Sequence, residues 1–149
     1  MKYNLDITIN LPREKVIELF DNPDNMKHWQ KGLVSFEHFS GEAGNVGAKS
    51  KLKYKMGKRE IEMIETITKR DLPNEFSGTY EAKGVWNDMK NYFSIVDENK
   101  TKWASEVEFK FSGFMKIIAF LMPGNFKKQS YKYMVDFKNF AENGTSFIQ

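Results

Sequence analysis

The sequence predicts an α+β domain in which a curved antiparallel sheet of seven strands surrounds a long C-terminal helix. Six segments between residues 33 and 111 alternate apolar and polar residues, which is the period of half-buried strands. A row at steps of four and three positions then follows, with aromatic residues at Phe126, Tyr133, Phe137 and Phe140 and with Ser130 among them, which places one apolar stripe along a helix. The last strand needs a cover for its apolar face, and this helix is the element long enough to provide it.

The N-terminal region predicts one strand followed by two short helices. Residues 2–9 alternate polar with apolar side chains, which predicts a strand with one buried face. Pro12 fits the first turn of a helix, where its missing N–H costs nothing. Asn22-Pro23 indicates the start of a second short helix, which Trp29 anchors in the core and Gly32 ends.

Short turns rich in Gly, Pro, Asn and Asp separate the remaining strands, as in an antiparallel meander. We expect strands at residues 33–39, 49–56, 59–69, 75–82, 85–96 and 101–111. Pro123-Gly124 should kink or split the helical region that follows, and Asn143-Gly144 should end it. Residues 145–149 are expected to form a loose tail, and residues 1–149 a single domain.

Composition excludes several classes of function. A net charge of +3, from 23 basic and 20 acidic residues, argues against a nucleic-acid-binding protein, which usually has a concentrated basic face. The lysines at 49, 51, 53 and 55 share one side of a strand and indicate a solvated face, with contact to an anionic membrane surface or an acidic ligand as the alternative. Cysteine is absent and there are only two histidines, so we expect no disulfide, no metal site and no cofactor. The N-terminus lacks the apolar core of a signal peptide, which favours a cytoplasmic protein.

These elements and several local motifs resemble the START-like or Bet v 1-like superfamily, also called the polyketide cyclase/dehydrase and lipid transport group or SRPBCC group. The motifs are Ile9-Asn10-Leu11-Pro12-Arg13-Glu14-Lys15-Val16, Phe20-Asp21, Trp29, the turn Gly44-Asn45-Val46-Gly47 and the long C-terminal helix. The resemblance covers nearly the whole chain and implies a helix-grip fold. It also implies binding or transport of a hydrophobic small molecule, lipid-like or polycyclic, between sheet and helix. Members of the group include lipid carriers, hormone receptors, cyclases and chaperone activators, so the activity stays open.

Residues on the inward rows of the strands and helix are the candidate ligand contacts. The candidates are Tyr54, Met63, Glu65, Phe76, Tyr80, Asn87, Met89, Asn91, Phe93, Trp103, Ser105, Phe126, Ser130, Tyr133 and Phe137. The same rows contain Leu52, Met56, Ile61, Ile67, Ile95 and Phe109. The polar members could orient the polar end of an apolar ligand. Alternatively, the side chains pack on one another and leave no space, or a bulge turns Glu65 towards solvent.

Two other functions stay open. In a cyclase- or dehydratase-like enzyme, Glu65 would act as a general acid or base with Tyr80 or Tyr133 as its partner, although no residue is assigned as catalytic. A protein-interaction module of the chaperone-activator type would use the outer face of the sheet. Residues 114–122 are apolar on more than one side, which indicates a gate for ligand, a transient membrane contact or a homodimer interface.

Overall fold

A computed structural model describes residues 1–148, and Gln149, the end of the predicted tail and domain, lies outside the described residues. The strands are β1 (Lys2–Ile9), β2 (Leu33–Ser40), β3 (Lys49–Met56), β4 (Arg59–Asp71), β5 (Glu75–Ala82), β6 (Val85–Asp97) and β7 (Lys100–Phe111). The helices are α1 (Arg13–Phe20), α2 (Met26–Trp29), α3 (Phe114–Leu121) and α4 (Pro123–Asn143), with a 3-10 turn at Pro23–Asn25.

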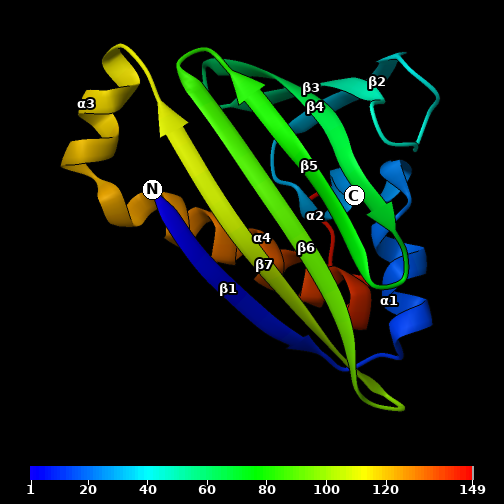
Figure 1. Ribbon diagram of the computed structural model, residues 1–149. Coiled ribbons are helices and arrows are strands. Elements are labelled where there is room, and N and C mark those ends of the chain that lie inside the picture. Colours follow the sequence, from blue (N-terminus) through cyan, green and yellow to red (C-terminus); the bar gives the residue numbers. More distant parts are fainter. Residues whose placement is uncertain (149) are drawn as a thin grey trace.

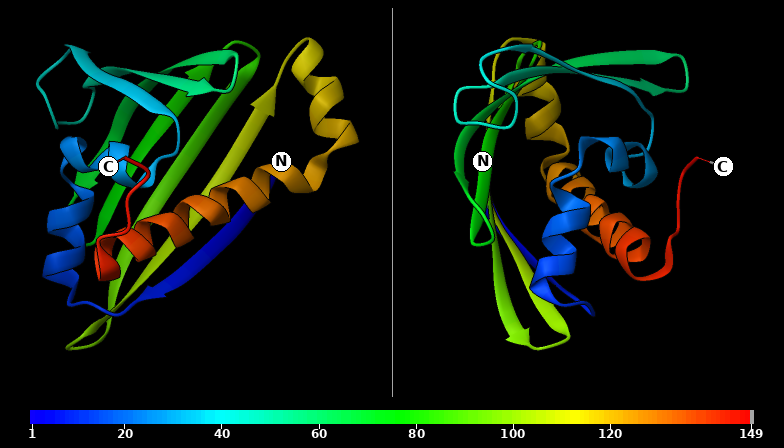
Figure 2. Two further views of the ribbon diagram at one scale, coloured as in Figure 1. Left: turned by 180° about the vertical axis from the view of Figure 1, so that it is seen from behind. Right: turned by 90° about the vertical axis from the view of Figure 1, so that its right-hand side faces the viewer.

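The seven strands form one antiparallel sheet in the order β1-β7-β6-β5-β4-β3-β2. Figure 1 shows this sheet as a curved surface, and α1, α2 and α4 all lie on its concave side in the edge-on view of Figure 2. The predicted fold class is therefore confirmed. Each predicted strand exists, and its ends lie within two residues of the predicted ones.

Proline divides the C-terminal helical region into two helices, as predicted. Met122, between α3 and α4, has φ −133° and ψ 60°, which is not helical, and Pro123 occupies the first turn of α4. Gly144 ends α4 with a left-handed φ of 72°, and its N–H donates to the carbonyl of Phe140. No helix among residues 1–148 is long and apolar enough to cross a membrane.

One end of the space between the sheet and the helices is filled by an aromatic cluster. This cluster consists of Phe20, Trp29, Phe93, Trp103 and Phe137. The ring of Phe20 lies 5.0 Å from that of Phe93, 5.4 Å from that of Trp103 and 5.7 Å from that of Phe137. These spacings are those of interlocking rings, so the cluster joins α1, α2 and α4 to β6 and β7 of the sheet.

The C-terminal tail is fastened to the domain, so the expectation of a loose tail is wrong for residues 145–148. The N–H of Phe147 donates to the carbonyl of His28 at 3.0 Å, and the His28 ring is 2.7 Å from the hydroxyl of Ser146. The same ring stacks on Phe140 at 5.3 Å. These contacts hold the tail across α2 and α4.

Candidate ligand-binding site

Strand register places one row of polar side chains across the inner face of the sheet. Ser50 pairs with Glu65, Glu65 with Tyr80, and Tyr80 with Asn87 on successive strands from β3 to β6. All four point towards the helices, because the side chains that alternate with them along each strand point to the convex side. We call Ser50, Glu65, Tyr80 and Asn87 the polar row.

Glu65 lies on the inner face, as its predicted site role requires. The bulge in β4 lies between Ile67 and Lys69, beyond Glu65, so the register at Glu65 is intact. Only 7% of the Glu65 side chain is exposed. The alternative in which a bulge turns Glu65 towards solvent is therefore wrong.

The ionisable groups around the polar row perturb one another. Burial raises the pKa of the Glu65 carboxyl, and a hydrogen bond from the Tyr80 hydroxyl offsets part of this rise. Burial also raises the pKa of Tyr80 well above its ordinary value, and the neighbouring Glu65 charge adds to that shift. The pKa of Tyr54 is raised by burial first and then by the nearby Tyr133 and Glu65. Tyr133 of α4 therefore lies close to Tyr54 of β3.

Tyr54 has a second polar neighbour that the sequence pattern does not indicate. Its hydroxyl donates to the side-chain carbonyl of Gln30 at 2.5 Å. Gln30 directly follows α2, so this bond connects the segment after the short helices to the inner face of β3. No spacing rule relates a residue at a helix end to a strand residue 24 positions later.

Asn91 and Ser105 serve the packing of the aromatic cluster. The indole Nε1 of Trp103 donates to the side-chain carbonyl of Asn91 at 3.0 Å, and the Ser105 hydroxyl donates to the same oxygen at 2.6 Å. Only 5% of Asn91 and 1% of Ser105 is exposed. Because their polar atoms are already hydrogen-bonded, we infer that Asn91 and Ser105 position the Trp103 ring.

Three further candidates, Phe93, Trp103 and Phe137, are members of the aromatic cluster, and Phe76 packs beside Phe20 at its rim. Phe93, Trp103 and Phe137 are almost completely buried against one another. For these three, the geometry favours the alternative of mutual packing, and contact with a ligand stays a prediction.

Five further candidates lie beyond the aromatic cluster and are less completely covered. Met63, Tyr80, Met89, Phe126 and Tyr133 are each only partly buried, although they stand on the inner rows. Along the sheet, α4 packs chiefly against β1, an edge strand, rather than against β3 to β5. The inner face of the central strands therefore keeps accessible surface. We call Tyr54, Met63, Glu65, Tyr80, Asn87, Met89 and Tyr133 the inner patch.

The helix row faces the sheet at its N-terminal end as well. Ser130 is 2.7 Å from the Tyr3 hydroxyl, and that hydroxyl also donates to the backbone carbonyl of Phe126. The Phe126 ring packs 5.2 Å from Phe109 and 4.8 Å from Phe111. The Ser130 hydroxyl is thus hydrogen-bonded to a tyrosine of the edge strand β1, and Phe126 packs on β7, whereas Tyr133 belongs to the inner patch.

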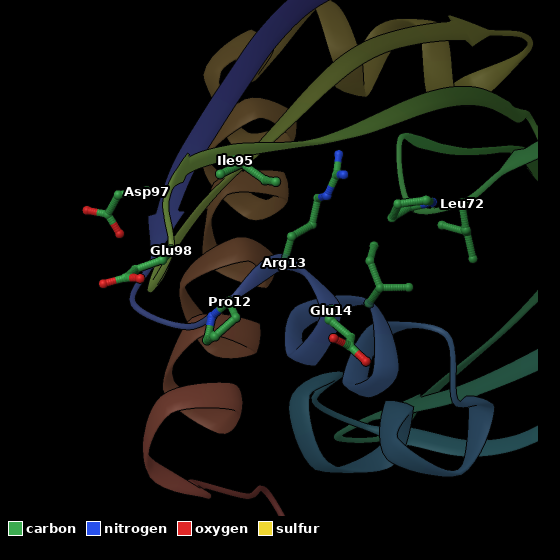
Figure 3. Close-up of a pocket in the computed structure, with 9 residues that line it drawn as sticks. Pro12, Arg13, Glu14, Leu72, Ile95, Asp97 and Glu98 are labelled. Atoms are coloured by element: carbon green, nitrogen blue, oxygen red, sulfur yellow. The ribbon is translucent and has the colours of Figure 1, made fainter.

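Two surface grooves lie outside the inner face. A groove of about 530 Å³ separates the start of α1 from the β4–β5 and β6–β7 turns, and Figure 3 shows Arg13, Leu72, Ile95 and Asp97 around it. A groove of about 290 Å³ lies at the β5–β6 turn, beside Trp86 and Lys110. None of the fifteen candidate ligand contacts lines either groove.

The prediction that Ile95 lines the interior is wrong. It is 61% exposed and lies at the larger groove. β6 extends beyond the layer of helices at this end, as Figure 1 shows, so an inward-pointing side chain there meets the edge of α1 instead of a core. Met56, at the tip of the β3–β4 hairpin, was expected on the inner row and is exposed as well.

The raised pKa of Glu65 predicts a stability that depends on pH. The folded state keeps the Glu65 proton at pH values where the unfolded chain has lost it. The free energy of unfolding should therefore fall as pH rises from the ordinary carboxyl pKa through the raised one. Urea titrations at a series of pH values should show this fall in the wild type and a flatter profile in Glu65→Gln.

Glu62→Gln is the matched control for this experiment, because Glu62 lies on the same strand but on the outer, exposed face. Its profile should follow that of the wild type. Parallel pH profiles for the wild type and Glu65→Gln would contradict the assigned burial.

Comparison with known proteins identifies the fold. A scan against protein-family models finds no match, and a search of curated proteins finds none either. Among solved structures, Ara h 8.0201 matches with a TM-score of 0.74 and 13% identity, over 95% of this chain and 97% of that one. Norcoclaurine synthase from Thalictrum flavum matches with a TM-score of 0.71 and 10% identity, over 96% and 94%.

A third match is the di-domain ARO/CYC protein StfQ from the steffimycin biosynthetic pathway. Its TM-score is 0.73 and its identity 14%, over 95% of this chain and 45% of the longer protein. At such low identity these matches report on the fold, and all three agree on it. The chain has the helix-grip fold of Bet v 1-like structures.

Proposed function

We propose that this protein binds a mostly apolar small molecule that carries a polar group, and that it does so at the inner patch, between the sheet and α4. The observation that carries the proposal is the polar row, set beside partly exposed methionine and aromatic side chains on a concave surface. Apolar lining with a few placed polar groups is the usual make-up of small-molecule sites.

The chemistry of the inner patch supports a ligand with a hydroxyl or carbonyl group. Tyr80 can donate or accept a hydrogen bond, and a protonated Glu65 can donate one. Around them, Met63 and Met89 offer flexible apolar surface that adapts to irregular shapes. Release of water from this surface would drive binding, by about 25 cal/mol per Å² of apolar area before entropy costs.

The structural neighbours are consistent with a small-molecule role. One is a synthase and another belongs to a biosynthetic pathway. Because their identity to this chain is low, they support the binding of some small molecule by this fold. They say nothing about which molecule is bound.

A second candidate function is acid–base catalysis at the same place. Its support is the pairing of Glu65, whose pKa is raised by burial, with the Tyr80 hydroxyl. A carboxyl with a raised pKa can deliver a proton and take it back. Glu65→Gln should then abolish turnover of a substrate but leave its affinity largely intact, whereas a pure carrier would show a change in affinity alone.

Native mass spectrometry of the purified chain tests the binding proposal. We expect a bound species heavier than the chain by the mass of one small molecule, which organic extraction removes. The extracted protein should then bind oleate or anilinonaphthalenesulfonate with one-to-one stoichiometry. Repeated preparations without an adduct, combined with no binding of either probe, would contradict the proposal.

A further inference from the structure

The α3 helix and the residue after it carry a patch of exposed large apolar side chains. We call this the α3 patch, and it consists of Phe114 (70% exposed), Ile117 (54%), Phe120 (84%), Leu121 (67%) and Met122 (45%). Spacings of three and four residues place the four helical members on one face. Contiguous apolar surface of this kind usually marks an interaction site.

The opposite face of α3 fixes the helix to the domain. Ala119 is buried, and Met115 packs so closely over the β5–β6 turn that a Cβ on Gly84 would lie 2.9 Å from its Cγ. Gly84 also has φ +77°, so both the close contact and the backbone conformation require glycine at this position. Figure 1 shows α3 at the corner of the molecule beyond the end of β7. The α3 patch is therefore held facing outward.

The charged residues near the α3 patch in the sequence are all lysines. Lys116 lies within α3, Lys127 and Lys128 lie near the start of α4, and all three are exposed. No acidic residue occurs between Glu108 and Asp136. An exposed apolar helix face beside lysines matches the surface of a bilayer that contains anionic lipids, in chemistry and in charge.

A second copy of the chain fits the α3 patch less well. In a two-fold symmetric dimer the same surface meets itself, so the lysines of both copies would be brought together. Like charges across an interface oppose association. Charge complementarity thus favours an anionic lipid surface over a homodimer.

We propose that α3 docks on the surface of bilayers containing anionic phospholipid, with the α3 patch inserted among the headgroups and the lysines beside the lipid charges. The helix has eight residues, about 12 Å at 1.5 Å per residue, so it lies in the interface and does not span the bilayer. This surface is separate from the inner patch, and docking requires no ligand there.

Sedimentation with vesicles tests the docking. The wild type should bind vesicles of phosphatidylcholine mixed with phosphatidylserine more tightly than vesicles of phosphatidylcholine alone, and added NaCl should weaken that preference. Phe114→Ser combined with Phe120→Ser should weaken binding at least about tenfold, because two large apolar side chains no longer insert. Lys127→Glu combined with Lys128→Glu should remove the preference for phosphatidylserine.

The matched control is Val34→Ser, which removes an apolar side chain 67% exposed on β2 and should leave vesicle binding unchanged. Unchanged circular dichroism would show that the variants fold. Equal binding of the wild type and the serine variant, or no binding to either vesicle, would overturn the proposal. A dimer in analytical ultracentrifugation that Phe120→Ser dissociates, without vesicle binding, would also overturn it and identify a second copy as the occupant.

Discussion

Phe137→Ala should lower the free energy of unfolding by about 3–5 kcal/mol, the cost of deleting a fully buried aromatic side chain. Phe137 has no exposed surface, and its ring lies 5.1 Å from Trp29 and 5.4 Å from Trp103. Its loss would open a cavity where α4, α2 and the sheet meet. The surrounding rings are themselves large and interlocked, so they could not relax to fill it.

Urea unfolding followed by far-UV circular dichroism measures this loss. Phe120→Ala is the matched control, since it is the same substitution at a position that is 84% exposed, and it should change stability by less than about 0.5 kcal/mol. Similar unfolding midpoints for the two variants would show that the aromatic cluster is not the centre of the fold.

Met89→Trp should reduce the affinity for oleate and for anilinonaphthalenesulfonate at least about tenfold, or 1.4 kcal/mol. Met89 stands on the inner face of β6 and pairs with Gly78 of β5, which has no side chain to cover it. A tryptophan there would occupy the surface that we assign to the ligand. Because Met89 is only partly buried, the larger ring should be accommodated without unfolding the sheet.

Isothermal titration calorimetry measures the affinity, and Met56→Trp serves as the control. It makes the same change at the tip of the β3–β4 hairpin, away from the polar row, and should leave affinity within about twofold of the wild type. If Met89→Trp bound both probes as tightly as the wild type, the ligand would not lie on the inner patch.

The fold could be predicted because its main signals are local. Period-two alternation locates the strands, and Pro123 and Gly144 mark the start and end of α4. The docking of the tail could not be predicted in this way. It depends on one backbone N–H, from Phe147, and one hydroxyl, from Ser146, and neither leaves a periodic pattern.

The candidate site was predictable only in part. Alternation correctly assigns Glu65, Tyr80 and Asn87 to the inner face, because one buried face fixes the register of each strand. Alternation does not tell which part of the inner face is covered by packed side chains and which part stays accessible. Phe20 enters the aromatic cluster from α1, and only the packing of α1 on the sheet determines where its ring lies.

Pairs distant in sequence explain the other differences. The Ser130 hydroxyl is hydrogen-bonded to Tyr3, which lies 127 residues away. Trp103 of β7 donates a hydrogen bond to Asn91 of the neighbouring strand β6. Such pairs become visible only when the register and the tilt of α4 are known. For Ile95, the predicted face of the strand is correct but the predicted burial is not. β6 extends past the helices that would cover this side chain.

Methionine-methyl NMR tests the central claim most directly, because the eight methionines are spread over the molecule. Met63 and Met89 report on the inner patch, Met134 on the aromatic cluster, and Met115 and Met122 on the α3 helix and its patch. Titration with oleate should shift the methyl signals of Met63 and Met89 to saturation and leave that of Met134 nearly unchanged. Shifts confined to Met115 and Met122, or no shifts at all, would contradict a ligand between the sheet and α4.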